Sequence, residues 1–154
     1  MAETFALTKR GEMVTAEFDH EARIEELKQR KDPCAATNKM RFVHLSYGYV
    51  AIEMPILHEM TVQEGLANGG YVVVLMNTAA VYAAMSVIPE GHTRLLESTP
   101  RFTNPAWLAR VIVAHATLKH ESGSFIDIDV DAYDKANGKL IAHGNYMYYK
   151  PEAK

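Results

Sequence analysis

A short run of glycine and asparagine stands directly before the longest uncharged segment of the chain, and it is the stretch best suited to chemistry. Residues 65–70 (GLANGG) lead into residues 71–88, which carry no charged side chain. Glycines let another group approach the backbone closely, and the first turn of a helix offers unpaired N–H groups and the positive end of its dipole. This combination suits an anion or the oxyanion that develops in acyl transfer. In the structural alternative, Asn68 is only a helix cap and Gly69 and Gly70 only a tight turn.

Asn77 is a second polar group in this region, nine residues beyond Asn68 and inside the apolar segment. A buried amide without partners costs about 1–3 kcal/mol, so Asn77 needs a hydrogen-bond partner, a water or a ligand. The structural alternative for Asn77 is a hydrogen bond to a carbonyl of a neighbouring sheet. Thr78 beside it can bond back to its own helix.

The other polar patterns favour structural roles, and we expect no metal site. Asp127, Asp129 and Asp131 alternate with apolar residues, which is typical of a half-buried strand. The seven histidines form no i, i+4 pair on a helix and no HExxH pattern, and Cys34 has no CxxC partner. The sequence also contains no Walker loop, GxGxxG or GxSxG motif.

Composition limits the class of protein. The 154 residues are 48% apolar with a net charge of −3, which predicts one folded domain and gives no basic face for nucleic acid. The single cysteine excludes an intramolecular disulfide and fits a reducing cytoplasm. The first residues contain no apolar signal-peptide core, so we expect a cytoplasmic protein.

The 18 uncharged residues 71–88 reach the lower limit of a membrane span, but they contain Asn77, Thr78 and Ser86 and have no basic flank. This composition favours a helix buried in the protein core, and we expect no contact with a membrane.

The remaining elements follow from periodicity. We expect a flexible tail over residues 1–16 and a single domain over 17–150. Within it, residues 18–31 predict an amphipathic helix that ends at Asp32-Pro33. Residues 55–66 read as a connection that leads into the buried helix. Strands are predicted over 41–54, with a break near Tyr47-Gly48, over 93–102, interrupted at Pro100, and over 109–119, 124–133 and 139–149. The economical arrangement is an α+β fold in which a curved antiparallel sheet wraps around a long central apolar helix.

These elements and motifs resemble the hotdog-fold thioesterases, in particular the phenylacetate-pathway type. The run GLANGG…LMNTA over residues 65–79 is similar to that family's Gly-x-x-His-Gly-Gly…Leu-x-Asp-x-Ala signature at the same spacing. The resemblance covers about residues 35–149. Supporting stretches are TPRFTNPA (99–106), AHATLK (114–119) and DKANGKLIAHG (134–144).

The resemblance implies a hotdog fold that assembles as a homodimer or homotetramer, with active sites at the dimer interface. Its substrates would be acyl-CoA or acyl-carrier thioesters, with no cofactor except coenzyme A as part of the substrate. By position, the backbone N–H groups of Gly70 and Tyr71 would polarise the thioester carbonyl. Asn68 stands where the family has histidine. Asn77 stands where it has the carboxylate, which in such enzymes comes from the other subunit and attacks the carbonyl or activates water.

This departure leaves two readings open, because an amide has no useful proton affinity. In the first, the chain is a thioester hydrolase in which Asn77 orients a water and Glu64 or Glu97 is the base. An oxyanion hole alone can contribute ~10²–10³ in rate. In the second, the chain binds a thioester without cleaving it, or is a hydratase-type enzyme acting at the α,β carbons.

Substrate contacts are expected around the same segment. Gly69, Thr78, Glu97 and Arg101 are the candidate substrate-binding residues. Tyr71, Val74, Leu75 and Met76 suggest an apolar or aromatic acyl group. The candidates for the coenzyme A phosphates are Arg101, Arg110 and Lys119, for which a solvated surface charge is the alternative.

Overall fold

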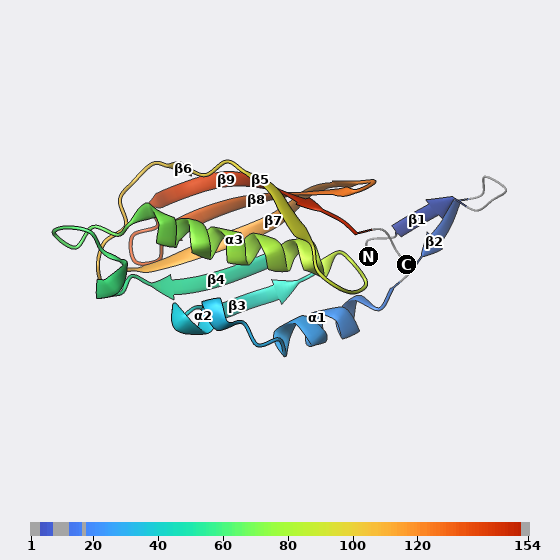
Figure 1. The fold of residues 1–154 in the computed structure, drawn as a ribbon, viewed down its shortest axis with the longest axis horizontal. Coiled ribbons are helices and arrows are strands. Elements are labelled where there is room, and N and C mark those ends of the chain that lie inside the picture. The colour runs from blue at the N-terminus through green and yellow to red at the C-terminus, as the bar shows by residue number, and fades with distance from the viewer. Residues whose placement is uncertain (1–3, 8–12, 17, 152–154) are drawn as a thin grey trace.

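An antiparallel sheet curves around one long helix in the computed structural model (Figure 1). The structure describes residues 4–7, 13–16 and 18–151, and for the first two ranges only the backbone. Within these residues the main sheet has seven strands in the order β3-β4-β7-β8-β9-β5, and β6 also pairs with β9. The strands are β3 (Arg41–Ser46), β4 (Tyr49–Pro55), β5 (Arg94–Ser98), β6 (Arg101–Phe102), β7 (Val111–Ser122), β8 (Phe125–Asp134) and β9 (Leu140–Tyr149).

The predicted sheet is therefore confirmed, including the break at Tyr47-Gly48 and the interruption at Pro100. Residues 99–100 pass between β5 and β6 close over β9. A Cβ at Gly144 in β9 would lie 3.0 Å from Pro100 Cα, so glycine permits this close approach. The chain then continues past β6 toward the beginning of the long helix.

The long helix is α3 (Gly69–Ser86), which lies across the concave face of the sheet against β4, β7 and β8 (Figure 1). Its buried residues include Leu75, Met76 and Ala79, which are inaccessible to solvent. Among the described residues α3 is the one helix long and apolar enough to cross a membrane, but most of it is buried in the domain. The predicted buried central helix is confirmed.

The segment before the sheet differs from the sequence prediction. Helix α1 (His20–Lys28) ends four residues before Asp32, and a short helix α2 (Pro33–Thr37) follows. Asp32 caps α2, since its Oδ1 accepts from Ala35 N at 3.0 Å. Pro33 thus begins a helix instead of ending one, because a proline at the first helical position loses no hydrogen bond. The predicted connection over 55–66 contains the 3-10 turn η1 (His58–Met60).

Arg23 joins α1 to the last turn of α3. This side chain is almost completely buried, with its residue 3% exposed. Its Nε donates to Met85 O at 3.2 Å, and its Nη2 donates to Gly91 O at 2.8 Å. The Met85 carbonyl also accepts from Ile88 N at 3.4 Å, so Arg23 is a second donor to a carbonyl at the C-terminus of α3. Glu26 pairs with Arg23 Nη1 at 2.8 Å and supplies the compensating charge.

Strand β8 shows the alternation expected from its sequence. Ile126, Ile128 and Val130 are buried on the helix side, whereas Asp129 and Asp131 are exposed on the other side. Asp127 and Asp129 both accept hydrogen bonds from the Asn145 side chain. No group of side chains within the described residues has the arrangement of a metal site.

Residues before α1 form a separate pair of strands. β1 (Thr4–Leu7) and β2 (Met13–Ala16) pair antiparallel with each other and not with the main sheet. The predicted flexible tail over 1–16 lies partly outside the described residues, at 1–3 and 8–12. The division into a tail and one domain over 17–150 stays a prediction.

Candidate functional site at the start of α3

Asn68 caps α3 with its side chain. Its Oδ1 accepts from Gly70 N at 2.9 Å, and its backbone carbonyl accepts from Tyr71 N at 3.0 Å. A side chain at Gly70 would crowd this cap, because a Cβ there would lie 3.2 Å from Asn68 Oδ1. The two N–H groups predicted to polarise a carbonyl are thus both engaged by Asn68. An incoming oxygen reaches Gly70 N–H only by displacing Asn68 Oδ1, so the oxyanion role of Gly70 and Tyr71 stays a prediction.

Gly69 N–H is the donor of this turn that makes no hydrogen bond within the described residues. Gly69 lies against the Phe102 ring, and a Cβ at Gly69 would come within 3.1 Å of Phe102 Cζ. Both residues line a cleft of about 400 Å³, called the α3 cleft below. Its lining consists of Leu66, Ala67, Gly69, Val72, Phe102, Thr103, Asn104, Pro105, Ala106 and Ile141. The helix start is therefore open to a ligand from one side.

Two loops hold the walls of the α3 cleft together. Residues 61–67 form a tight turn in which Leu66 N donates to Gln63 O at 2.9 Å, with both Glu64 and Gly65 at positive φ. This turn is bonded to the loop between β6 and β7, since Ala67 N donates to Ala106 O at 2.9 Å. Leu108 N donates to Gly65 O at 2.8 Å, so Leu66 and Trp107 face each other in an antiparallel bridge. The cleft thus has walls fixed by backbone hydrogen bonds.

Asn77 lies on the stripe of α3 that the sheet leaves partly exposed, together with Tyr71, Val74 and Val81. Its Oδ1 accepts from the Tyr148 hydroxyl of β9 at 2.8 Å. Burial raises the pKa of the Tyr148 phenol, so this hydroxyl stays a neutral donor. The Asn77 Nδ2 group makes no hydrogen bond within the described residues and is available to a water or a carbonyl oxygen. The structural alternative expected a sheet carbonyl as the partner of Asn77, and the partner in the structure is the Tyr148 hydroxyl instead.

The other candidates are less closely grouped. Thr78 is buried, and its hydroxyl donates to Val74 O at 2.8 Å within its own helix, as the sequence allowed. Thr78 does not line the α3 cleft. Glu64 is exposed at the tip of the 61–67 turn, and Glu97 is exposed on β5. Neither makes an ion pair within the described residues. Their role as a base stays a prediction.

The three predicted phosphate contacts have different surroundings. Arg110 binds Asp134 through two hydrogen bonds of 2.8 and 3.0 Å, and Lys119 approaches Asp129 at 3.8 Å. Arg101 is exposed and lines a separate polar hollow with Asp129 and Asp131. The charges of Arg110 and Lys119 are therefore partly compensated, and Arg101 is not part of the α3 cleft.

The predicted acyl surface needs a correction. Leu75 and Met76 are fully buried against the sheet, so they cannot line a site on the outer face of α3. Tyr71 and Val74 remain partly exposed on that face. The apolar surface that remains accessible on α3 is therefore the outer stripe, where Asn77 also lies.

Comparison with known proteins identifies the family. A family model described as the thioesterase superfamily matches residues 64–141, just over half of the chain, including the α3 cap, Asn77 and the paired strands that follow. The chain belongs to the thioesterase superfamily. No curated protein matches it in a sequence comparison.

Solved structures show that this thioesterase-superfamily chain has the hotdog fold, as the resemblance implied. The Escherichia coli PaaI protein from the phenylacetic acid degradation operon superposes with a TM-score of 0.79 at 17% identity, covering 88% of this chain and 96% of that one. Zebra fish thioesterase superfamily member 2 gives 0.70 at 21% identity, covering 84% and 94%. A Streptococcus mutans protein bound to acetyl CoA gives 0.69 at 15% identity, covering 75% and 90%.

Four residues in or next to this candidate site were not singled out from the sequence. Phe102 and Tyr148 contact Gly69 and Asn77, and Trp107 and Lys139 lie in a neighbouring pocket. Tyr148 had a usable signal, because alternation along 139–149 places it on the same face as Tyr146. The only tryptophan of the chain, in a loop after a proline, was a second signal. Phe102 and Lys139 had none, since their contacts depend on the path of two loops.

Proposed function

We propose that the chain hydrolyses an acyl-CoA or acyl-carrier thioester at the start of α3. The observation that carries this proposal is the unpaired N–H of Gly69, in the first turn of α3 and open to the α3 cleft. A backbone donor at a helix N-terminus stabilises the negative charge that develops on a carbonyl oxygen. Membership of the thioesterase superfamily supports the same chemistry. No cofactor is required beyond the coenzyme A of the substrate.

In this proposal the thioester carbonyl oxygen accepts from Gly69 N–H, and from Gly70 N–H once Asn68 Oδ1 has moved away. The partner subunit's Asn77 Nδ2 donates to the oxygen of the attacking water and so positions it, because Asn77 of the same chain lies eight residues, about 12 Å, further along α3 than Gly69. The water oxygen forms a bond to the carbonyl carbon while Glu64 or Glu97 takes its proton. The carbon–sulfur bond then breaks, the sulfur takes that proton back from the carboxylate and leaves as the thiol, and the acyl group leaves as the carboxylic acid. Asn77 orients the water, and a carboxylate from elsewhere supplies the basicity.

We propose that the active unit is a homodimer or a homotetramer. Strand β5 ends the sheet, and its Leu95 and Leu96 are 41% and 46% exposed. The register shifts between Leu95, which pairs with Tyr148, and Glu97, which pairs with Met147, so Leu96 lies at an irregularity of this edge. An apolar, unpaired edge is suited to pairing with a second copy. The partly exposed stripe of α3 offers further apolar surface.

The test is release of free thiol from a panel of acyl-CoAs that differ in chain length and aromaticity. We expect turnover in the wild type and at least about a tenfold loss in Asn77→Ala. Asn38→Ala is the matched control, since Asn38 ends α2 and lies outside the site. Glu64→Gln and Glu97→Gln identify the base by which of them loses turnover.

Binding without hydrolysis is the second candidate function, and the amide at Asn77 favours it, because an amide cannot act as a base. It predicts saturable binding of acyl-CoA with no thiol release at any chain length. That result would overturn the hydrolase proposal. A change at the α,β carbons of an unsaturated acyl-CoA, again without thiol release, would indicate the hydratase-type reaction.

A further inference from the structure

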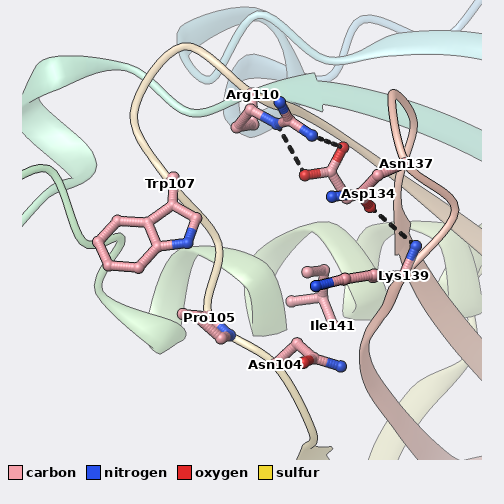
Figure 2. A pocket seen from close by; sticks show the side chains of 8 residues that line it. All are labelled: Asn104, Pro105, Trp107, Arg110, Asp134, Asn137, Lys139 and Ile141. Carbon is pink, nitrogen blue, oxygen red and sulfur yellow. Dashed lines mark hydrogen bonds and ion pairs between the residues drawn. The ribbon is translucent and has the colours of Figure 1, made fainter.

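A second pocket of about 340 Å³ lies next to the α3 cleft. Figure 2 shows Trp107 on one side of it and the Lys139 side chain extending toward that side, with the Arg110–Asp134 pair above both in this view. The pocket, called the Trp107 pocket below, is lined by Asn104, Pro105, Trp107, Arg110, Asp134, Asn137, Lys139 and Ile141. Its volume falls within the range of about 300–1,000 Å³ that is usual for ligand sites.

The Trp107 pocket adjoins the α3 cleft. Asn104, Pro105 and Ile141 line both of them. Trp107 also bridges to Leu66, three residues before the start of α3. A single extended ligand can therefore occupy the α3 cleft with one end and the Trp107 pocket with the other.

Trp107 offers an exposed aromatic face. It is 46% exposed, although tryptophan is usually among the better buried residues. The backbone holds it in place: Arg110 N donates to Trp107 O at 3.1 Å around a turn in which Ala109 has a φ of 65°. A large, rigid aromatic surface fixed in this way is suited to stacking with a planar ring.

The polar groups of the Trp107 pocket favour an anion. Asp134 is neutralised by Arg110, through hydrogen bonds of 2.8 and 3.0 Å. Lys139 is exposed and has no carboxylate partner within the described residues. The pocket therefore contains one uncompensated positive charge, on Lys139. Arg110 Nη1 and Asn137 Nδ2 also make no hydrogen bond within that part of the chain and remain as donors.

We propose that the Trp107 pocket binds the nucleotide end of coenzyme A, with the adenine ring on Trp107 and a phosphate on Lys139. This inference rests on the proposed function, because it places the thioester of the same molecule at Gly69. It selects acyl-CoA over an acyl-carrier protein, whose prosthetic arm carries no adenine. It also moves the phosphate contact from Arg110 and Lys119 to Lys139.

Trp107 supplies its own probe, since it is the only tryptophan of the chain. The experiment titrates the wild-type protein with coenzyme A, adenosine 3′,5′-bisphosphate and pantetheine, and follows tryptophan fluorescence. We expect saturable quenching by coenzyme A and by the bisphosphate, because both carry adenine and phosphate. Pantetheine has neither group and should not quench. Quenching should weaken as salt concentration rises.

Two variants and one control separate the contacts. Lys139→Gln should raise the dissociation constants of coenzyme A and the bisphosphate about tenfold. A change of this size is usual when a hydrogen bond to a charged group is lost. Trp107→Leu should also weaken the binding of both ligands, which calorimetry measures. Lys135→Gln is the matched control, because Lys135 is already paired with Glu53 at 2.6 Å and is not part of the pocket. It should leave both constants unchanged.

The outcomes separate this inference from the proposed function. Absence of quenching by coenzyme A, equal quenching by pantetheine, or equal effects of Lys139→Gln and Lys135→Gln would each overturn the nucleotide site. Each of these results is compatible with thiol release from acyl-CoA. Conversely, a protein that binds the bisphosphate at Trp107 but releases no thiol keeps the nucleotide site and loses the hydrolase proposal.

Discussion

The Tyr148 hydroxyl donates to Asn77 Oδ1 at 2.8 Å and determines which end of the amide faces away from the sheet. With Oδ1 held by Tyr148, the Nδ2 donor is the end left for a substrate or a water. Tyr148 is 1% exposed, so no solvent competes for this hydrogen bond. A residue of β9 thus orients the Asn77 amide of α3.

Tyr148→Phe should lower turnover by about tenfold with a smaller change in KM, because the Asn77 amide loses its fixed orientation (about 1.4 kcal/mol). Loss of one hydrogen bond should also lower stability by about 1 kcal/mol. Steady-state kinetics and thermal unfolding measure the two effects. Tyr146→Phe is the matched control, since the buried Tyr146 hydroxyl has no partner within the described residues. Equal losses of turnover in both variants would show that Tyr148 does not orient Asn77.

Asn77→Asp should introduce a base where the wild type has an amide. In a Glu64→Gln or Glu97→Gln background that has lost turnover, the new carboxylate should restore thiol release, with a rate that falls as pH drops through about 4. The measurement is a pH–rate profile of the double variant beside one carrying Asn77→Ala. Restoration by alanine as well as by aspartate would contradict a role in proton transfer at this position.

Asn68→Ala should destabilise the domain by about 1 kcal/mol, because α3 loses its side-chain cap at Gly70 N. Asn68→Ser keeps a capping oxygen and should retain most of the stability. Chemical denaturation of the three proteins compares their free energies of unfolding. If alanine and serine are equally destabilising, the hydrogen bond to Gly70 does not contribute.

Asp134→Asn should lower the melting temperature more at pH 7 than at pH 3. The hydrogen bonds from Arg110 hold the pKa of Asp134 below its ordinary value. A carboxyl whose pKa is lower in the folded state stabilises the protein above its unfolded pKa and loses this contribution as pH falls below about 4. Melting temperatures at pH 7, 5 and 3 follow the difference. Glu90→Gln is the control, because Glu90 is exposed and unpaired in the described part of the chain. If Asp134→Asn lowers the melting temperature equally at all three pH values, the Arg110–Asp134 pair does not contribute to stability in this way.

Leu96→Glu should convert the proposed dimer to a monomer, because it places a charge on the exposed edge strand β5. Light scattering coupled to size-exclusion chromatography measures the mass in solution. Val62→Glu is the control, because Val62 is 58% exposed but lies in the turn before α3, away from β5. A dimer that persists in Leu96→Glu would exclude pairing along this edge.

The sequence predicted the elements well where hydrophobic periodicity was strong. Strands β7 to β9 alternate regularly, and the apolar helix is bounded by Asn68 and by Pro89, so both were predictable. Helix α2 was missed because a proline favours the end of one helix and the start of another equally well. Contacts between distant segments could not be predicted. Phe102 covers Gly69, and Tyr148 holds Asn77, only because of how β6 and β9 pair across the sheet.

The two ends of α3 meet different charges, because Arg23 lies at only one of them. Peptide dipoles leave about half an elementary charge of opposite sign at each terminus of a helix. The buried guanidinium of Arg23 offsets the negative pole at Met85, whereas no acidic side chain lies in the first turn. The positive pole at Gly69 is therefore left for an incoming ligand, because no carboxylate in the first turn of α3 competes for it. Replacing Arg23 would change the last turn of α3 and leave that pole unaltered, because the influence of a helix dipole is confined to the first and last turns.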